Sequence, residues 1–168
     1  MHREQPGARG VWSEEDGFTL LELMMVVLII AILIAVLIPV FLGATTRAKD
    51  RAVQSNLSTA LDAAKSAFTS QNADYSTVTP ALLSNEAGAL TWVASNSTPT
   101  SPSTVSVLQA PAGNTQQLIL AAQSKSGSCF YVLDDESNGA RFAKLPGAGG
   151  CAANGAPIPT DPSWKATW

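Results

Sequence analysis

This 168-residue sequence has few charged residues and a single histidine. Charged residues make up 14% of the chain, which is low for a soluble domain of ordinary composition. The net charge of −3 argues against nucleic-acid binding driven by overall charge. No strongly basic patch occurs in the C-terminal part either, so a nucleic-acid partner is not supported. The histidine is His2, which leaves none for a metal or catalytic cluster further along.

The sequence motifs of enzymes are also missing. After the first 17 residues the chain has no His/Cys cluster, no Ser/His/Asp set and no phosphate-binding glycine loop. We therefore predict that the protein is not an enzyme and has no catalytic residue, no cofactor and no metal site.

One acidic stretch near the C-terminus loosely follows the pattern of a calcium-binding loop: Asp134, Glu136, Asn138 and Gly139. Glutamate occupies the third position of that pattern, and Leu145 stands where the closing glutamate would fall. A solvated hairpin turn is the favoured interpretation, and a calcium loop remains the minor alternative.

The sequence contains one long apolar run. No charged residue occurs from Leu23 to Thr46. As a helix this run would span about 36 Å, enough to cross a hydrocarbon core of about 30 Å. It is too long for the core of an ordinary signal peptide, lacks an Ala-x-Ala site and follows an acidic segment. The run therefore predicts a membrane helix rather than a segment that is removed during secretion.

A lone carboxylate, Glu22, stands at the start of this run, and the residues before it read Gly17-Phe18-Thr19-Leu20-Leu21. An ionisable side chain in that position is costly and normally marks a functional site with a partner. The segment closely resembles the processing site of type IV prepilins and the related pseudopilins. In that family a hydrophilic leader ends in Gly, and Phe, Thr-Leu, an aliphatic residue, Glu and a long apolar helix follow.

The resemblance extends over residues 17–44 and implies a processing reaction. Residues 1–17 would be a leader peptide, and a prepilin peptidase would cut after Gly17 and methylate the amine of Phe18. In many leaders of the family, Lys or Arg precedes the final Gly. This leader departs from that pattern, because Glu14-Glu15-Asp16 precede Gly17. A glycine before the cut bond lets the backbone enter a tight protease site without a side-chain clash.

The resemblance also implies how the protein assembles. Glu22 would pair with the cationic amine of Phe18 on a neighbouring subunit, because each charge alone in hydrocarbon costs several kcal/mol. The implied partners are other copies of the chain or related pilins, the peptidase/methyltransferase, and the pilus assembly platform with its ATPase. A glutamate at the interface with no partner is the alternative interpretation of Glu22.

The location follows from the same resemblance. It implies a single-pass protein of the cytoplasmic membrane, with its C-terminal domain outside, that later enters a cell-surface filament. Charge does not give the orientation, because two arginines precede the run and three basic residues follow it: Arg3, Arg9, Arg47, Lys49 and Arg51.

Three functions remain open from the sequence. The leading one is a structural subunit of a type IV pilus or pilus-like filament. The second is a pseudopilin of a type II secretion or DNA-uptake system, which carries the same motif. The third is an uncleaved surface protein held in the membrane by its signal anchor.

The long helix is predicted to have two halves. Residues 18–45 form the transmembrane and polymerisation half, and Pro39 is expected to kink or locally melt it, because proline removes a helical hydrogen bond. Residues 46–72 form an amphipathic half, whose apolar residues recur at helical spacing: Val53, Leu57, Ala60, Leu61, Ala64 and Phe68.

Residues 73–168 are predicted to form a globular, β-rich domain, so that the fold class is α+β with a small antiparallel sheet laid on the long helix. Thr79-Pro80 predicts a short capped helix, and residues 96–103 predict a loop. The expected strands are residues 105–109, 117–123, 129–133 and 140–144. Asn138-Gly139 suits a type I′ turn between the last two strands.

The two cysteines, Cys129 and Cys151, predict one disulfide if this domain is exported, and two free buried thiols are the alternative. A bridge would hold the irregular segment 147–162 against the last strands. The chain-entropy model gives it a stabilisation of roughly 3 kcal/mol. Trp164 and Trp168 either pack against the sheet or lie exposed on the surface.

Overall fold

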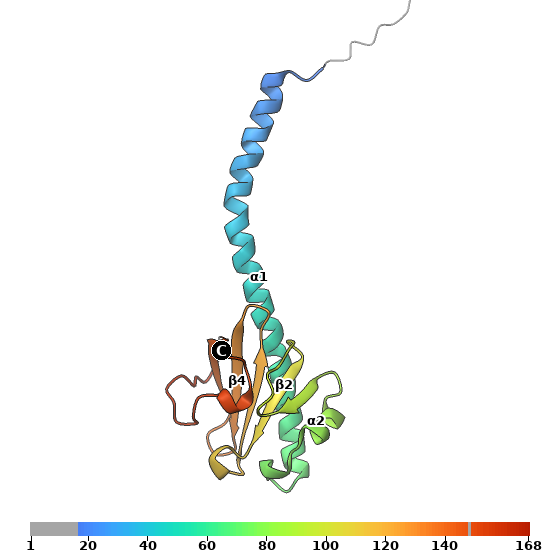
Figure 1. Ribbon diagram of the computed structural model, residues 1–168, viewed down its shortest axis with the longest axis vertical. Helices are drawn as coiled ribbons and strands as arrows, with labels where there is room; N and C mark the ends of the chain where they lie inside the picture. Colours follow the sequence, from blue (N-terminus) through green and yellow to red (C-terminus); the bar gives the residue numbers. More distant parts are fainter. Residues whose placement is uncertain (1–16, 148) are drawn as a thin grey trace, which may run out of the picture. The chain divides into compact units, whose positions relative to one another are not determined.

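The computed structural model describes residues 17–147 and 149–168, and the predicted leader before Gly17 lies outside the described residues. The chain divides into two compact units, Met1–Phe41 and Leu42–Trp168, which are described separately. Helix α1 (Leu20–Ser70) begins in the first unit and ends in the second (Figure 1).

In the first unit, every described residue is exposed, including all the large apolar side chains from Leu20 to Ile38. The helix continues without interruption through Pro39, so local melting there is absent, and the predicted kink stays a prediction. By length and composition, α1 is the one helix in the described part of the chain that is apolar and long enough to cross a membrane.

The second unit contains a five-stranded sheet with the order β1-β2-β3-β4-β5. The strands are β1 (Thr91–Ala94), β2 (Thr104–Gln109), β3 (Gln117–Gln123), β4 (Ser128–Asp135) and β5 (Arg141–Pro146). Besides α1, the helices of this unit are α2 (Pro80–Glu86) and three short 3-10 turns, η1 (Tyr75–Thr77), η2 (Pro111–Gly113) and η3 (Ala153–Gly155). The α+β class, with a long helix packed on a mostly antiparallel sheet, is confirmed.

Four of the five strands and the capped helix α2 are where the sequence predicts them. The hydroxyl of Thr79 caps α2 by accepting a hydrogen bond from the amide of Leu82. Strand β1 was not predicted, and it adds one parallel pairing, with β2, to the otherwise antiparallel sheet. Four residues are too few to show an alternating pattern, and parallel pairing leaves no hairpin signal in the sequence.

The turn between β4 and β5 was predicted at the right place but with the wrong geometry. A type I′ turn needs positive φ at both central residues, and Gly139, at φ 74°, has it while Asn138 does not. The carboxylate of Asp135 instead accepts hydrogen bonds from the amide of Ser137 and the side chain of Asn138. An aspartate that hydrogen-bonds its own downstream backbone stabilises this longer loop.

The first core of the unit lies between α1 and one face of the sheet (Figure 1). The predicted apolar stripe of α1 is buried here in full, and the helix ends at Ser70, two residues before the predicted end of its amphipathic half. Alternate residues of the three central strands meet it: Val105, Val107, Leu118, Leu120, Ala122, Phe130 and Val132. Burial of a side chain such as Leu57 stabilises the fold by about 1.5–3 kcal/mol.

A second core lies on the opposite face of the sheet, under the C-terminal segment. The bridge between Cys129 and Cys151 is formed, and both cysteines are buried. Trp164 is buried in the same cluster, and its indole nitrogen donates to the carbonyl of Ile158 at 3.0 Å. The irregular segment is therefore held down by one covalent bond and one aromatic anchor.

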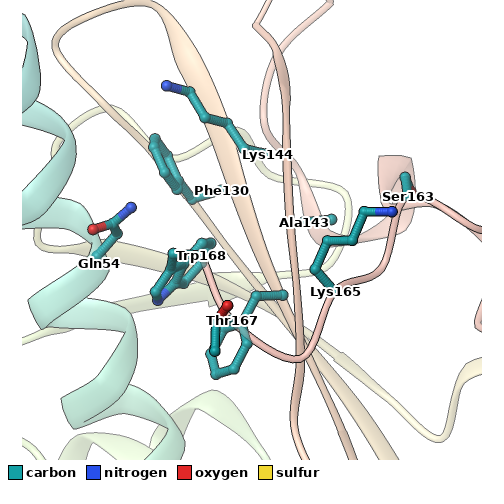
Figure 2. Close-up of a pocket in the computed structure, with 9 residues that line it drawn as sticks. Gln54, Phe130, Ala143, Lys144, Ser163, Lys165, Thr167 and Trp168 are labelled. Atoms are coloured by element: carbon teal, nitrogen blue, oxygen red, sulfur yellow. The ribbon is translucent and has the colours of Figure 1, made fainter.

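After Trp164 the chain passes around the free edge of β5. Lys165 exchanges two backbone hydrogen bonds with Phe142, each 2.8 Å long, and so covers part of an edge that would otherwise be open to pairing with other chains. Trp168 then packs on Phe142 and Phe130 and lines a shallow pocket with Gln54 of α1 (Figure 2). Trp164 is thus buried, whereas Trp168 remains 40% exposed.

A polar cluster fixes one end of the helix–sheet interface. The buried carboxylate of Asp50 accepts hydrogen bonds from Ser124 and Ser126 in the β3–β4 turn and from Lys144 of β5, whose Nζ lies 2.7 Å away. Burial alone would raise the pKa of Asp50, but these donors and the Lys144 charge outweigh it and lower the pKa. Neither the apolar stripe nor the strand pattern predicts this cluster.

A second polar contact fixes the opposite end. The phenol of Tyr75 donates to the carboxylate of Asp134 at the end of β4, and both side chains are buried. Lys65 of α1 approaches the same carboxylate at 3.7 Å. Burial, together with the neighbouring Asp134 charge, raises the pKa of Tyr75 far above its ordinary value, so the phenol stays protonated.

We predict that Asp50→Ala lowers the free energy of unfolding by about 1–3 kcal/mol, because it leaves two hydroxyls and an ammonium without their acceptor. The control is Asp62→Ala, at an exposed position on the same helix, which should change stability by less than about 0.5 kcal/mol. Equal effects of the two substitutions in denaturant unfolding would contradict the role of Asp50.

The same cluster predicts an acid sensitivity. The pKa of Asp50 lies below its ordinary value of 3.8 in the folded state, so its contribution is present above that pH and is lost as the pH falls towards the folded-state value. Unfolding curves measured from neutral pH down to pH about 3 should show less acid destabilisation in Asp50→Ala than in the natural protein.

We predict that replacing both Cys129 and Cys151 by alanine costs roughly 3 kcal/mol in the chain-entropy model, since the bridge closes a separation of 22 residues. Thermal unfolding with and without reductant measures the effect. The double variant should be insensitive to reductant. A loss below about 1 kcal/mol would mean that the Trp164 anchor holds the C-terminal segment without the bridge.

Candidate functional site

The candidate site lies at the start of α1. Gly17, Phe18 and Thr19 are not helical, and the helix begins at Leu20. Thr19 caps it: its hydroxyl accepts a hydrogen bond from the amide of Glu22 at 3.2 Å, and its carbonyl accepts one from the amide of Leu23 at 3.2 Å. The capping hydroxyl satisfies one of the four amides that a helix N-terminus leaves without partners.

The role of Thr19 was missed from the sequence, although its signal is present. Thr19-Leu20-Leu21-Glu22 has the Thr-x-x-Glu spacing of a capping box, in which the glutamate is the third helical residue. A carboxylate in the first helical turn also lies at the positive end of the helix dipole, which favours a negative charge there.

The Gly17–Phe18 bond lies two residues before the first helical residue and is open to solvent. Phe18 is 83% exposed, and among the described residues none beyond its chain neighbour would lie within 4 Å of a Cβ atom at Gly17. The described part of the chain therefore imposes no packing demand for glycine at this position. The peptide bond is in an accessible, non-helical segment, as a bond that a protease cuts has to be.

Glu22 is exposed, and none of the ion pairs among the described residues involves it. Because the residues that follow are uncharged up to Thr46, no basic side chain of the same helix is within a few turns. The described part of the chain therefore brings no partner to this carboxylate.

The calcium alternative for the β4–β5 turn is not supported by the geometry. Asp134 points into the helix-side core, where Tyr75 and Lys65 contact its carboxylate. Hydrogen bonds from Asn138, Gln117 and Ser137 outweigh the effect of burial and lower the pKa of Asp135. Within residues 17–147 and 149–168, no three metal-ligating side chains of His, Cys, Asp or Glu come together.

Comparison with protein families gives one match. Residues 12–38 match the model of the prokaryotic N-terminal methylation motif, the signature of type IV prepilins. Searches of curated proteins and of solved structures found no match. The matched segment contains the Gly17–Phe18 bond, the capping residue Thr19, Glu22 and the beginning of the apolar helix. It supports a type IV pilin-like or pseudopilin protein, which fits a structural rather than an enzymatic role.

We predict that Thr19→Val frays the first turn of α1, because valine keeps the shape of threonine but has no oxygen to accept the Glu22 amide. Loss of a cap costs about 1 kcal/mol, which corresponds to roughly fivefold faster exchange of that amide. Hydrogen exchange of the full chain in detergent micelles measures it, and Thr19→Ser, which keeps the hydroxyl, is the control. Unchanged exchange in Thr19→Val would show that the helix start does not depend on this cap.

Proposed function

We propose that this protein is a structural subunit of a type IV pilus or a pilus-like filament. It would be inserted in the cytoplasmic membrane, cut after Gly17, methylated at Phe18 and assembled through the first half of α1. The observation that carries the proposal is the methylation motif at residues 12–38, which coincides with an accessible, non-helical Gly17–Phe18 bond. Each further step rests on the chemistry of the same segment.

Membrane insertion is supported by the exposed apolar surface. Large aliphatic side chains such as Leu28 and Ile32 of α1 are about half exposed or more. Water contact with so much apolar area is unfavourable by about 25 cal/mol for each Å². A lipid bilayer removes this cost for a single chain, and neighbouring copies of the same helix remove it in a filament.

Processing is supported by the accessibility of the Gly17–Phe18 bond and by the open space that the described residues leave around Gly17. A peptidase that accepts only a small residue before the cut would account for glycine at this position. Cleavage would leave Phe18 as a new N-terminus with a cationic amine, which the same class of enzyme would methylate. Prepilin peptidase/methyltransferase, the assembly platform and its ATPase are the partners that this proposal requires.

Assembly is supported by the carboxylate of Glu22, which forms no ion pair with any described residue. Once cleavage has created the Phe18 amine, a carboxylate and an amine of opposite charge lie at the same end of an apolar helix. In hydrocarbon each of these charges is costly alone, and pairing relieves part of the cost. A neighbouring subunit that supplies the amine to Glu22 would therefore set the axial register between copies. The globular unit would lie on the outer side of the cytoplasmic membrane, where the environment is oxidising and its disulfide is stable.

We predict that Glu22→Ala leaves membrane insertion intact but abolishes or severely reduces filament formation. The control is Glu136→Ala, which removes an exposed carboxylate from the globular unit without touching the apolar helix. Membrane fractionation measures insertion, and electron microscopy of sheared material measures filaments. Normal filaments from Glu22→Ala would rule out charge pairing as the assembly mechanism.

The pseudopilin function shares the same motif and the same first steps, and filament abundance separates the two. A pilus subunit is recovered in bulk in the sheared extracellular fraction, whereas a pseudopilin stays with the membrane. An uncleaved anchored protein would keep residues 1–17 and form no polymer.

A further inference from the structure

The basic residues that follow the apolar run have no role in the function proposed above. Arg47, Lys49 and Arg51 are exposed, and none of the ion pairs within the described residues uses them. Basic residues after a membrane helix count against export of the part that follows, by the positive-inside tendency. Their presence at this position therefore calls for a physical reason.

These three side chains lie on two sides of the helix. Successive residues of an α-helix are about 100° apart, so Arg47 and Arg51 lie one turn apart on one side, and Lys49 lies on another. Asp50 points between them into the sheet. Since the helix rises about 1.5 Å for each residue, Arg51 lies only about 8 Å along the axis from Thr46, the last residue of the uncharged run.

The polar cluster at Asp50 adds a fourth basic residue at the same end. Lys125 is exposed in the β3–β4 turn, between Ser124 and Ser126, whose hydroxyls both bond to Asp50. The turn therefore carries its lysine to the level of Asp50 on the helix. We name Arg47, Lys49, Arg51 and Lys125 the basic collar.

Among the described residues of α1 up to Leu61 and of strands β3 and β4 before Asp134, no free acidic group lies beside the collar. Asp50 is the only acidic residue from Leu23 to Leu61, and it is buried and paired with Lys144. Strands β3 and β4 contain no acid before Asp134. Asp134, Asp135 and Glu136 all lie at the far end of β4, about 23 Å along the strand from Ser128. Positive charge is thus concentrated at the end of the globular unit where the apolar run stops.

We propose that the basic collar binds the headgroups of anionic phospholipids at the membrane surface and so holds the globular unit against the bilayer before assembly. The inference rests on the membrane insertion that the proposed function assumes. A membrane surface is the occupant that the geometry favours, because the collar begins where the uncharged run ends. Basic residues in that position are attracted to anionic lipid within about one Debye length, about 10 Å at 0.1 M salt.

The test uses the full chain reconstituted in vesicles of phosphatidylcholine alone or of phosphatidylcholine mixed with phosphatidylglycerol. Lipid that binds only the folded unit raises its thermal unfolding midpoint. We expect the midpoint to be about 5 °C or more higher in the anionic vesicles, given the usual strength of such contacts in a chain of this size. The difference should disappear in 1 M salt, where the Debye length is about 3 Å.

The matched variants each remove two positive charges. Arg47→Gln with Arg51→Gln should lose at least half of the lipid-dependent shift, whereas Lys65→Gln with Arg141→Gln, at the far end of the sheet, should keep it. Lys65 and Arg141 are in ion pairs, so their double variant should have a lower thermal unfolding midpoint in both kinds of vesicle. The comparison therefore uses only the difference in midpoint between the anionic and the neutral vesicles.

The inference would be overturned if anionic lipid did not raise the thermal unfolding midpoint, or if the two double variants showed equal rises. A rise that persisted in 1 M salt would overturn it as well. The chain could insert normally and show the same unfolding midpoint in both lipids, while the variant Arg47→Gln with Arg51→Gln fails to form filaments. That result would assign the collar to contacts between subunits instead. Flotation of the vesicles separates failure of the collar inference from failure of the proposed function. A chain that does not float with vesicles of either composition is not inserted in the membrane at all, which would contradict the proposed function.

Discussion

The constraint on which the whole protein depends is an apolar helix surface that water cannot solvate favourably. From Leu23 to Thr46 no charge interrupts α1, and its large side chains are exposed up to Leu42. In the proposed function this surface is covered by lipid or by other copies of the helix, and the cap at Thr19 and the carboxylate at Glu22 stand where it begins. The described part of the first unit, residues 17–41, therefore contains no buried residue.

Within the second unit, α1 changes from an exposed to a half-buried helix. Asp50 marks that change, because its carboxylate joins the helix to the β3–β4 turn and to β5 through three side-chain donors. Tyr75 and Asp134 make the corresponding polar contact at the other end of the interface. Between these two contacts the packing is apolar, and the opposite face of the sheet is covered by the segment that Cys151 and Trp164 hold in place.

The sequence predicts the parts of this structure that depend on local periodicity or on local turn chemistry. The apolar stripe of α1, the Thr79 cap and strands β2 to β5 follow from such patterns. Contacts between distant residues could not be predicted in this way. Asp50 meets Ser124, Ser126 and Lys144 only because the fold brings them together, and β1 pairs with β2 in parallel without a hairpin signal. At the site, Gly17, Phe18 and Glu22 were identified by resemblance, whereas Thr19 required attention to the spacing of a capping box.

The most direct test of the account is the intact mass and N-terminal sequence of the protein from the sheared extracellular fraction. The account predicts a chain that begins at Phe18 and carries one added methyl group on its amine. A chain that begins at Phe18 but is found only in membranes would support processing and favour a pseudopilin. A chain that still carries residues 1–17 would contradict the account and leave a protein held by an uncleaved anchor.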